Sequence, residues 1–242
     1  MSLIARLKAF KKKNDFNPGI SALIYNPFYF ARKGLFKAMR AEAPHLTGDL
    51  LDVGCGRKPY RHLFQVKSYV GMDIEQSGHT HEDEDIDVFY DGKKFPFEPG
   101  SFDAVLCNQV FEHVFNPEEF LQEITQVLKK DGQLLLSVPF AWDEHEQPYD
   151  YARYSSFALQ FLLEKNGFKI VSHHKCMNDI RAVLQLLNMF LFKKLGGSNK
   201  YQRLLVTLIF IAPVNILGSL IALIPAKNDD LYLDNVIRAQ KL

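Results

Sequence analysis

The stretch from Asp49 to Gly56, Asp-Leu-Leu-Asp-Val-Gly-Cys-Gly, decides the fold class of this chain. Its apolar residues indicate a short buried β-strand over residues 49–53, and two glycines follow almost directly. Glycine adopts positive φ angles easily, so the backbone after the strand can turn sharply and come close to a ligand. Ligands of parallel α/β sheets bind at this carboxyl end of the strands. The stretch therefore predicts a strand that ends in a ligand-binding loop.

Strands and helices alternate on both sides of this stretch. We expect helices over residues 28–42 and 155–166, and one that starts at Asn116-Pro117 and runs through Leu128. The further expected strands are 69–74, 87–90, 102–108, 133–138, 168–172 and 231–240. This alternation predicts an α/β fold with a mostly parallel sheet and helices on both faces.

Composition narrows the class of protein. The chain has 242 residues, 47% of them apolar, and a net charge of +1. That charge gives no overall field to attract nucleic acid, so no nucleic-acid partner is expected. The three cysteines form no CxxC pair, which favours a reduced, cytoplasmic setting.

The N-terminal segment lacks the continuous apolar core of a secretory signal, because lysines and arginine interrupt it. Leu3, Leu7 and Phe10 are spaced as on one face of a helix. Such a basic amphipathic helix suits an anionic membrane surface, and a solvated chain start stays open as the alternative.

A second acidic position supports a nucleotide-like ligand. Asp73 ends the strand 69–74, seventeen residues after Gly56. A carboxylate there accepts hydrogen bonds from ribose hydroxyls. The run Arg57-Lys58-Pro59 replaces the third glycine of a dinucleotide fingerprint, which disfavours NAD, and no GxxxxGK[ST] motif for a nucleoside triphosphate occurs.

Four ordered segments carry a resemblance to a known family. They are LLDVGCGRKPY (50–60), YVGMDI (69–74), DGKKFPFEPGSFDAVLCNQVFEHV (91–114) and EFLQEITQVLKKDGQLLLSVP (119–139). Over residues 50–168, about half of the chain, the sequence resembles class I S-adenosyl-L-methionine (SAM)-dependent methyltransferases of the branch that acts on small molecules. The resemblance implies a Rossmann-like three-layer sandwich with a seven-stranded, mostly parallel sheet and an antiparallel last strand. It also implies SAM as the cofactor.

The resemblance assigns cofactor roles to individual positions. The loop from Asp52 to Gly56 would line the methionine and ribose, and Asp73 would hold the ribose hydroxyls. Ile74 would lie against the adenine, Asp91 would receive its amino group, and Asn108 would help to hold the methionine. The segment 73–87 is too short and polar for the usual second helix, so an irregular loop is expected there. The predicted cofactor-binding residues are Asp52, Gly54, Cys55, Gly56, Asp73, Ile74, Asp91, Gly92 and Asn108.

Methyl transfer to a hydroxyl needs a proton acceptor beyond the strands 102–108 and 133–138. Glu112-His113 and the loop 140–154 lie there, and His145 is the leading candidate base because histidine titrates near neutral pH. Both histidines could instead be hydrogen-bonded packing, and Asp150 could form a structural ion pair with Arg153. The predicted catalytic residues are His145, His113 and Asp150.

No metal site is predicted from the sequence. The run from His79 to Asp85 is rich in acidic residues, but it has no cysteine partner and no HExxH spacing. A solvated acidic loop is the expectation for it.

A long apolar segment precedes the last expected strand. Leu204 to Pro225 are 22 residues without a charge, long enough to cross a bilayer. The resemblance implies that the strand 231–240 joins the same sheet as 49–53, and a single crossing would leave it on the wrong side of the membrane. Pro213 and Asn215 also interrupt the run. We therefore expect a helical insertion over residues 177–228, folded as a hairpin or a broken helix. Two roles stay open: a cap or homodimer interface, and a monotopic membrane contact that presents a lipid-linked acceptor.

The expected organisation is N-terminal helices over residues 1–45, a methyltransferase domain over 46–176 and 229–242, and the insertion over 177–228. The expected activity is methyl transfer from SAM to a small or lipid-linked acceptor, at oxygen. The rival hypothesis is a non-catalytic, membrane-associated binding module with the same fold. The expected location is cytoplasmic, with peripheral contact to the inner membrane face left open.

Overall fold

The computed structural model describes residues 14–75 and 84–242. The predicted basic helix around Leu3, Leu7 and Phe10 lies outside these residues. So do residues 79–83 of the predicted acidic loop.

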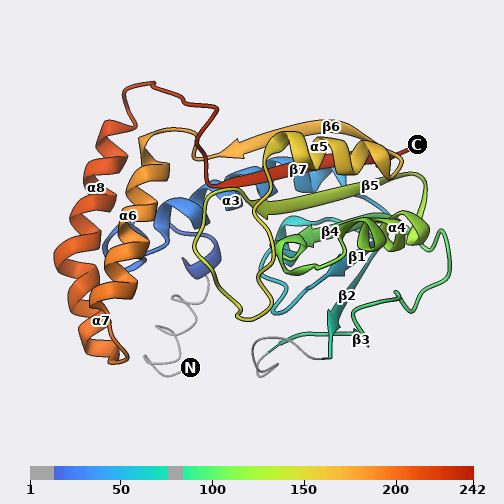
Figure 1. Ribbon diagram of the computed structural model, residues 1–242, viewed down its shortest axis with the longest axis horizontal. Coiled ribbons are helices and arrows are strands. Elements are labelled where there is room, and N and C mark those ends of the chain that lie inside the picture. Colours follow the sequence, from blue (N-terminus) through green and yellow to red (C-terminus); the bar gives the residue numbers. More distant parts are fainter. Residues whose placement is uncertain (1–13, 76–83) are drawn as a thin grey trace. The chain divides into compact units, whose positions relative to one another are not determined.

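A seven-stranded sheet is the centre of the fold, in the order β3-β2-β1-β4-β5-β7-β6 (Figure 1). Strands β1, β2, β3, β4 and β5 pair in parallel, and β7 runs antiparallel to β5. The predicted Rossmann-like fold class is therefore confirmed, including the antiparallel last strand. The strands are β1 (Asp49–Val53), β2 (Ser68–Ile74), β3 (Val88–Tyr90), β4 (Phe102–Asn108), β5 (Leu128–Pro139), β6 (Phe168–Cys176) and β7 (Asp234–Lys241).

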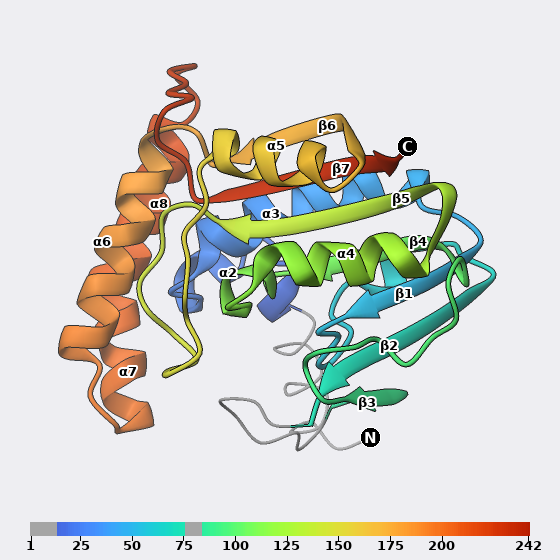
Figure 2. The same cartoon turned by 45° about the vertical axis from the view of Figure 1, so that its right-hand side comes forward.

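Burial of the central strands follows from their apolar sequence. Leu51 of β1, Val105 of β4 and Leu134 of β5 have no exposed surface, as expected for strands covered on both faces. Helices α4 (Pro117–Val127) and α5 (Ser156–Lys165) lie together over one face (Figure 2). Pro117 and two acidic residues open α4, and its apolar stripe enters the same core as Leu159 and Leu163 of α5.

The start of β5 differs from the prediction. The expected helix through Leu128 ends at Val127, and β5 begins at Leu128, five residues before the predicted Gln133. Asp131 has a φ of +63°, and the register of β5 against β4 shifts between Phe102 and Ala104. Lys-Lys-Asp-Gly is a common helix stop, but here it forms a bulge within an extended strand.

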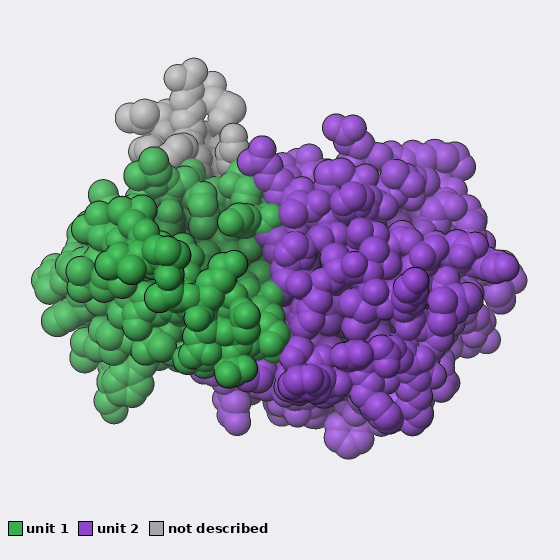
Figure 3. All heavy atoms as spheres, turned by 90° about the horizontal axis from the view of Figure 1, so that it is seen from above, with its two compact units in different colours: residues 1–37, 175–233 green, residues 38–174, 234–242 purple. Residues whose placement is uncertain are grey.

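The chain divides into two compact units (Figure 3). One comprises residues 38–174 and 234–242 and contains most of the sheet. The other comprises residues 1–37 and 175–233, of which 14–37 and 175–233 are described. The unit boundaries lie at 37/38, 174/175 and 233/234, against 45/46, 176/177 and 228/229 in the expected organisation.

Helices make up the second unit. They are α2 (Ala22–Tyr25), the first part of α3 (Tyr29–Glu42), α6 (Ile180–Leu195), α7 (Lys200–Val206) and α8 (Ala212–Ile221). Gln185 of α6 accepts from the Phe30 amide at 3.1 Å, and the Asn215 side chain donates to the carbonyl oxygens of Leu23 and Asn26 at 3.0 and 3.1 Å. These buried amides explain why the N-terminal segment groups with the insertion.

The apolar run forms one helical rod rather than breaking at Pro213. A π-helical turn, η4 (Thr207–Ile211), joins α7 to α8 just before this proline. Proline lacks an N–H and crowds the carbonyl four residues earlier, and a widened turn relieves both problems. The reversal of the hairpin lies instead between α6 and α7. Within the described residues, Lys200–Ile221 is the one helix long and apolar enough to cross a membrane by length and composition.

Candidate active site

The glycine loop is tied to the carboxyl ends of β1 and β2. The amides of Gly54 and Cys55 donate to the Met72 carbonyl at 2.8 and 3.1 Å. Gly54 has a φ of +68°, and a Cβ there would lie 2.3 Å from a methyl group of Val110. Only glycine fits this position. The segment that follows β4 is therefore packed directly against the predicted cofactor loop.

Asp73 lies where the sequence places it. Its Oδ2 accepts from the Gly56 amide at 2.9 Å, and its Oδ1 accepts from the Ile74 amide at 2.9 Å. Each carboxylate oxygen has two lone pairs, so both can also accept a hydroxyl of a ligand. The geometry fits a residue that holds a ribose.

The residues predicted to hold the adenine come together at the ends of β2 and β3. A Cβ on Gly92 would lie 3.7 Å from Ile74, so these two residues face each other. Asp91 Oδ1 accepts from the amides of Lys93 and Lys94 at 2.9 and 3.3 Å, which forms a turn. An amino group bound by Asp91 would therefore have to reach Oδ2.

Asp52 has a different environment from the one predicted. Its side chain is buried and accepts a hydrogen bond from the Tyr69 hydroxyl. Burial raises the pKa of Asp52 to about 7, and the nearby Asp73 charge adds to the effect. The carboxyl group thus joins β1 to β2, rather than lining an open methionine site. Cys55 is also buried, which raises the pKa of its thiol.

Lys58 directly precedes Pro59, the residue at the position of the third glycine of a dinucleotide motif. It has a structural role that its sequence position did not predict. It adopts a φ of +46°, and its Nζ lies 2.7 Å from Asp87 and 3.6 Å from Asp85. Asp87 also accepts from the Gly71 amide at 2.7 Å. These contacts fix the described end of the irregular segment beside the glycine loop.

Asn108 is held by a buried serine. The Ser137 hydroxyl donates to Asn108 Oδ1 at 2.8 Å and accepts from the Gln109 amide at 3.1 Å. Because the oxygen of Asn108 is used inside the protein, a ligand would meet its amide NH₂. Ser137 comes from the neighbouring strand and was not among the predicted site residues.

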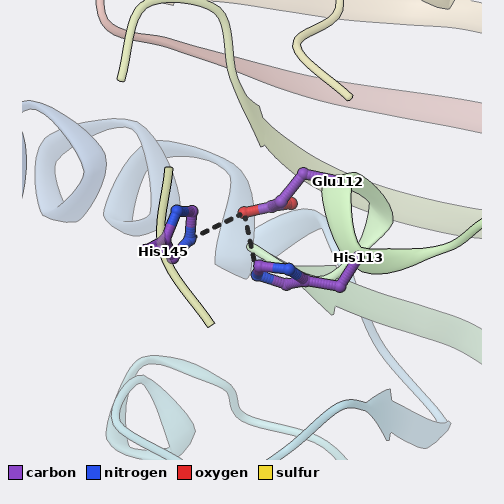
Figure 4. Close-up of side chains that lie close together, drawn as sticks. All are labelled: Glu112, His113 and His145. Carbon is purple, nitrogen blue, oxygen red and sulfur yellow. Dashed lines mark ion pairs between the residues drawn. The ribbon is translucent and has the colours of Figure 1, made fainter. Parts of the chain in front are cut away.

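A second cluster lies beyond the ends of β4 and β5 (Figure 4). Glu112 and His113 belong to the short helix η3 (Phe111–His113), and His145 comes from the loop after β5. Glu112 Oε1 lies 3.8 Å from Nε2 of His113 and 3.9 Å from Nε2 of His145. The structure thus brings together both histidines that the sequence predicts as catalytic.

Main-chain contacts hold the loop on η3. The Glu112 carbonyl accepts from the amides of Tyr151 and Ala152 at 2.9 and 3.2 Å. His113 Nδ1 lies 2.8 Å from the Tyr149 carbonyl oxygen, which can only accept, so Nδ1 carries the hydrogen. Burial lowers the pKa of His113 and favours its neutral form.

Asp150 forms the ion pair that the sequence left open. Arg153 donates to both of its oxygens at 2.6 Å, and Oδ2 also accepts from the His145 amide at 2.9 Å. Burial acts to raise the pKa of Asp150, but the hydrogen bonds from Arg153 and His145 outweigh it and lower this pKa to about 2. Asp150 is therefore a poor proton acceptor, and its role as a predicted base is replaced by that of a loop anchor.

Glu112 is the main residue that the predictions did not select. It is fully buried, and within the described chain neither carboxylate oxygen has a hydrogen-bond donor. Burial raises the pKa of Glu112 to about 8. The backbone N–H of Glu112 lies close enough to lower this pKa, but it does not form a hydrogen bond with the carboxyl group. The available signal is a single acidic residue that follows the apolar pair Val110-Phe111 and directly precedes His113.

Comparisons with known proteins agree with this geometry. Residues 51–136 match the family model described as a methyltransferase domain. Protein MJ1123 of Methanocaldococcus jannaschii is 29% identical over 108 residues, which are 44% of this chain and 51% of that protein. The chain thus matches about half the length of this curated relative.

Solved structures share the fold at low identity. An S-adenosylmethionine-dependent methyltransferase from Mesorhizobium loti matches with a TM-score of 0.53 and 12% identity, over 86% of this chain and 98% of its own. Phosphoethanolamine N-methyltransferase 2 from Haemonchus contortus, in complex with S-adenosyl-L-methionine, matches with a TM-score of 0.52 and 18% identity. The match covers 90% of this chain and 55% of that protein. The [4+2]-cyclase SpnF matches with a TM-score of 0.52 and 19% identity, over 84% of this chain and 79% of its own. Residues 51–136 thus match a methyltransferase domain, and the chain has the Rossmann-like methyltransferase fold that its sequence motifs predict.

Proposed function

We propose that this chain binds SAM at the carboxyl ends of β1, β2 and β4, and transfers the methyl group to a hydroxyl oxygen of a small or lipid-linked acceptor. One observation carries the proposal: Val110 packs on Gly54 of the glycine loop, two residues before Glu112. The predicted cofactor loop and the cluster of Glu112, His113 and His145 therefore adjoin one another.

The residues at the strand ends suit the parts of SAM. Asp73 would hold the ribose hydroxyls, Ile74 and Gly92 would enclose the adenine, and the amide of Asn108 would meet the methionine portion. When bound, SAM supplies an electrophilic methyl group on a good leaving group. The protein itself must align the acceptor, exclude water and remove the acceptor's proton.

The cluster is the best candidate for activating the acceptor oxygen. Three potential ligand or base atoms lie within 4.8 Å of one another, one each on Glu112, His113 and His145. Asp150 and Arg153 would hold the loop that carries His145. An oxygen acceptor needs such a site, because an alcohol is a weak nucleophile until its proton is removed or its charge is stabilised.

The apolar hairpin of α6 and α7–α8 supports a lipid-linked acceptor. Many of its large apolar side chains are exposed, and no acidic residue occurs between residues 180 and 228. Lys193, Lys194, Lys200 and Arg203 gather around the turn between the helices. Apolar surface next to basic residues suits the interface of an anionic membrane. The exposed residues in question are Val183, Leu187, Phe190, Leu204, Leu205, Leu208, Ile209, Ile216, Leu217 and Leu220.

Methyl transfer is tested with SAM that carries a labelled methyl group. The purified protein is incubated with polar and lipid fractions of a cell extract, and label transfer is compared with that of Asp73→Ala. We expect wild-type protein to label a compound in the lipid fraction through a linkage that resists base treatment, as an ether does, and Asp73→Ala to label little.

The rival hypothesis is the non-catalytic, membrane-associated binding module. The [4+2]-cyclase SpnF illustrates that a shared fold does not fix the reaction. SAM binding without label transfer to any fraction would favour this rival.

Membrane contact is tested by co-sedimentation with vesicles of anionic and of zwitterionic lipid. Phe190→Asp and Leu217→Asp place charges on half-exposed positions of the hairpin, and Phe157→Asp on α5 is the matched control. We expect the anionic vesicles to carry down wild type and the control but not the hairpin variants. If instead these variants only convert a dimer into a monomer during gel filtration, the surface is a homodimer interface.

A further inference from the structure

The cluster of Glu112, His113 and His145 has at its centre a buried carboxyl group without a hydrogen-bond partner in the described part of the chain. The Glu112 carboxylate is fully buried, and neither oxygen has a hydrogen-bond donor among the described residues. The nearest imidazole nitrogens lie 3.8 and 3.9 Å away, too far for hydrogen bonds. A buried carboxyl group without a hydrogen-bond partner is unfavourable in either protonation state. A cation between these three groups would satisfy the carboxylate and both imidazoles at once.

The histidine ring orientations point to a metal ion rather than a proton. His113 Nδ1 carries its hydrogen toward the Tyr149 carbonyl, which leaves the Nε2 lone pair facing Glu112. His145 Nδ1 lies 3.2 Å from the Asp143 carbonyl and 3.3 Å from Asp150 Oδ2, two acceptors. It also lies 3.3 Å from Arg153 Nη2, the single donor nearby among the described residues. The tautomer with hydrogen on Nδ1 donates to the Asp143 carbonyl and again leaves Nε2 toward Glu112.

We propose that Glu112, His113 and His145 bind one divalent transition-metal ion. Two imidazole nitrogens and a carboxylate form a set that Zn²⁺ accepts at open, catalytic sites, whereas Mg²⁺ prefers oxygen ligands. Ligand atoms around one Zn²⁺ lie about 3–3.5 Å apart, as its bond lengths and tetrahedral geometry require. The three atoms lie within 4.8 Å of one another, so side-chain shifts of about 1 Å would close the site.

Surrounding residues support the three ligands as they do in metal sites. Metal-binding histidines donate their second N–H to a carbonyl or carboxylate, which fixes the ring and its tautomer. The Tyr149 carbonyl is the acceptor for His113, and the Asp143 carbonyl is the acceptor for His145. Arg153 in turn fixes Asp150 by two hydrogen bonds. No metal site was predicted from the sequence, because His145 lies 32 positions after His113.

The metal would define how the acceptor is activated, a step that rests on the proposed function. Three protein ligands leave a position open for the acceptor oxygen, and coordination lowers the pKa of its hydroxyl. The O–H bond breaks and the proton passes to water. The oxygen then bonds to the methyl carbon as the carbon–sulfur bond breaks, and the sulfur takes the electron pair. His113 and His145 are ligands in this scheme and not bases.

Direct titration tests the site without any need for an acceptor. The full chain is stripped with a chelator and titrated with Zn²⁺ by calorimetry, with Mg²⁺ as the ion control. We expect one Zn²⁺ per chain, little Mg²⁺ binding, and at least a 100-fold loss of Zn²⁺ affinity in His145→Gln and in Glu112→Gln. The matched control is His45→Gln, an exposed histidine in η1 (Ala43–His45), before the start of β1.

Thermal unfolding provides a second readout that a purely structural role would not give. Zn²⁺ should raise the melting temperature of wild type and His45→Gln but leave that of His145→Gln unchanged. Unchanged affinity of His145→Gln for S-adenosylhomocysteine (SAH), the demethylated product of SAM, would show that this variant remains folded. The proposal is overturned if wild type binds no Zn²⁺, or if His145→Gln and Glu112→Gln bind it as tightly as wild type. Zn²⁺ binding without methyl transfer to any acceptor would instead count against the proposed function alone.

Discussion

Replacing Gly54 by alanine should be unusually costly, because two separate penalties coincide at this position. Gly54 has a φ of +68°, and an added Cβ would lie 2.3 Å from Val110 Cγ2 and 3.0 Å from its Cγ1. A left-handed conformation costs an L-residue about 1–2 kcal/mol. Overpacking adds about 1–3 kcal/mol, because a β-branched side chain cannot easily rotate away. We expect Gly54→Ala to lower the free energy of unfolding by about 2–5 kcal/mol.

Gly100→Ala separates the two penalties. Gly100 has a φ of +67°, but a Cβ added there would meet nothing within 4 Å, so only the conformational penalty of about 1–2 kcal/mol remains. The double variant Gly54→Ala/Val110→Ala should lose less stability than the sum of its single variants, since truncating Val110 removes the clash. Urea unfolding of the four variants measures this. Equal losses in Gly54→Ala and Gly100→Ala, with no coupling to Val110, would refute the packing of the β4 segment on the glycine loop.

Three further variants test the contacts around the site. Asp52→Asn should have a higher free energy of unfolding, relative to wild type, at pH 8 than at pH 5. The pKa of Asp52 is about 7 in the folded protein and 3.8 in the unfolded chain, so the wild-type protein loses stability as the pH rises between these values. The loss from pH 5 to pH 8 should be about 2–3 kcal/mol. Urea unfolding at both pH values measures this, and a pH-independent difference would contradict it. Arg153→Met should lower the free energy of unfolding by about 2–4 kcal/mol, because it removes the ion-pair partner of the buried Asp150 carboxylate. Adding Asp150→Asn should restore part of this loss. A loss below about 1 kcal/mol in urea unfolding would count against the ion pair. Ser137→Ala should lower the free energy of unfolding by about 1–3 kcal/mol and weaken SAH binding, because Asn108 loses its buried hydrogen-bond donor. If calorimetry shows unchanged SAH binding, Asn108 has no role in holding the cofactor.

Local sequence patterns predicted the sheet well. The apolar runs at β1 and β4 are bounded by glycine, proline and polar residues, and the observed strands match the expected ranges. The start of β5 was missed because Lys129-Lys130-Asp131-Gly132 is compatible with a helix end and with a bulge. Pairing with β4 selects the bulge, and this pairing is a tertiary contact that local propensity does not contain.

Pro213 shows the same limit within a helix. Proline predicts a break, yet η4 widens the turn before it and the helix continues. Asn215 is buried and bonded to the carbonyl oxygens of Leu23 and Asn26, nearly two hundred residues away in sequence. Packing against such distant segments keeps this helix together, and single-residue signals cannot supply it.

The site was predicted in part, for physical reasons that differ by residue. The place of Asp73 follows from its position at a strand end, which topology alone fixes. The environment of Asp52 depends on Tyr69 of the next strand, and that of Glu112 on a loop anchored through backbone hydrogen bonds. Burial of a charged residue is seldom expected from sequence, so Glu112 was placed near the acceptor but not selected among the predicted catalytic residues.

Calorimetric titration of SAH into the full chain tests the central claim, a SAM site at the ends of β1 and β2, most directly. Asp73 accepts from the Gly56 and Ile74 amides, so Asp73→Asn is a milder companion to Asp73→Ala in case the loop needs this residue to fold. We predict one binding site in wild type and at least a tenfold loss of affinity in both variants, with unchanged circular dichroism. Absence of binding by wild type, or equal affinity in all three proteins, would contradict the assignment of this strand end to SAM.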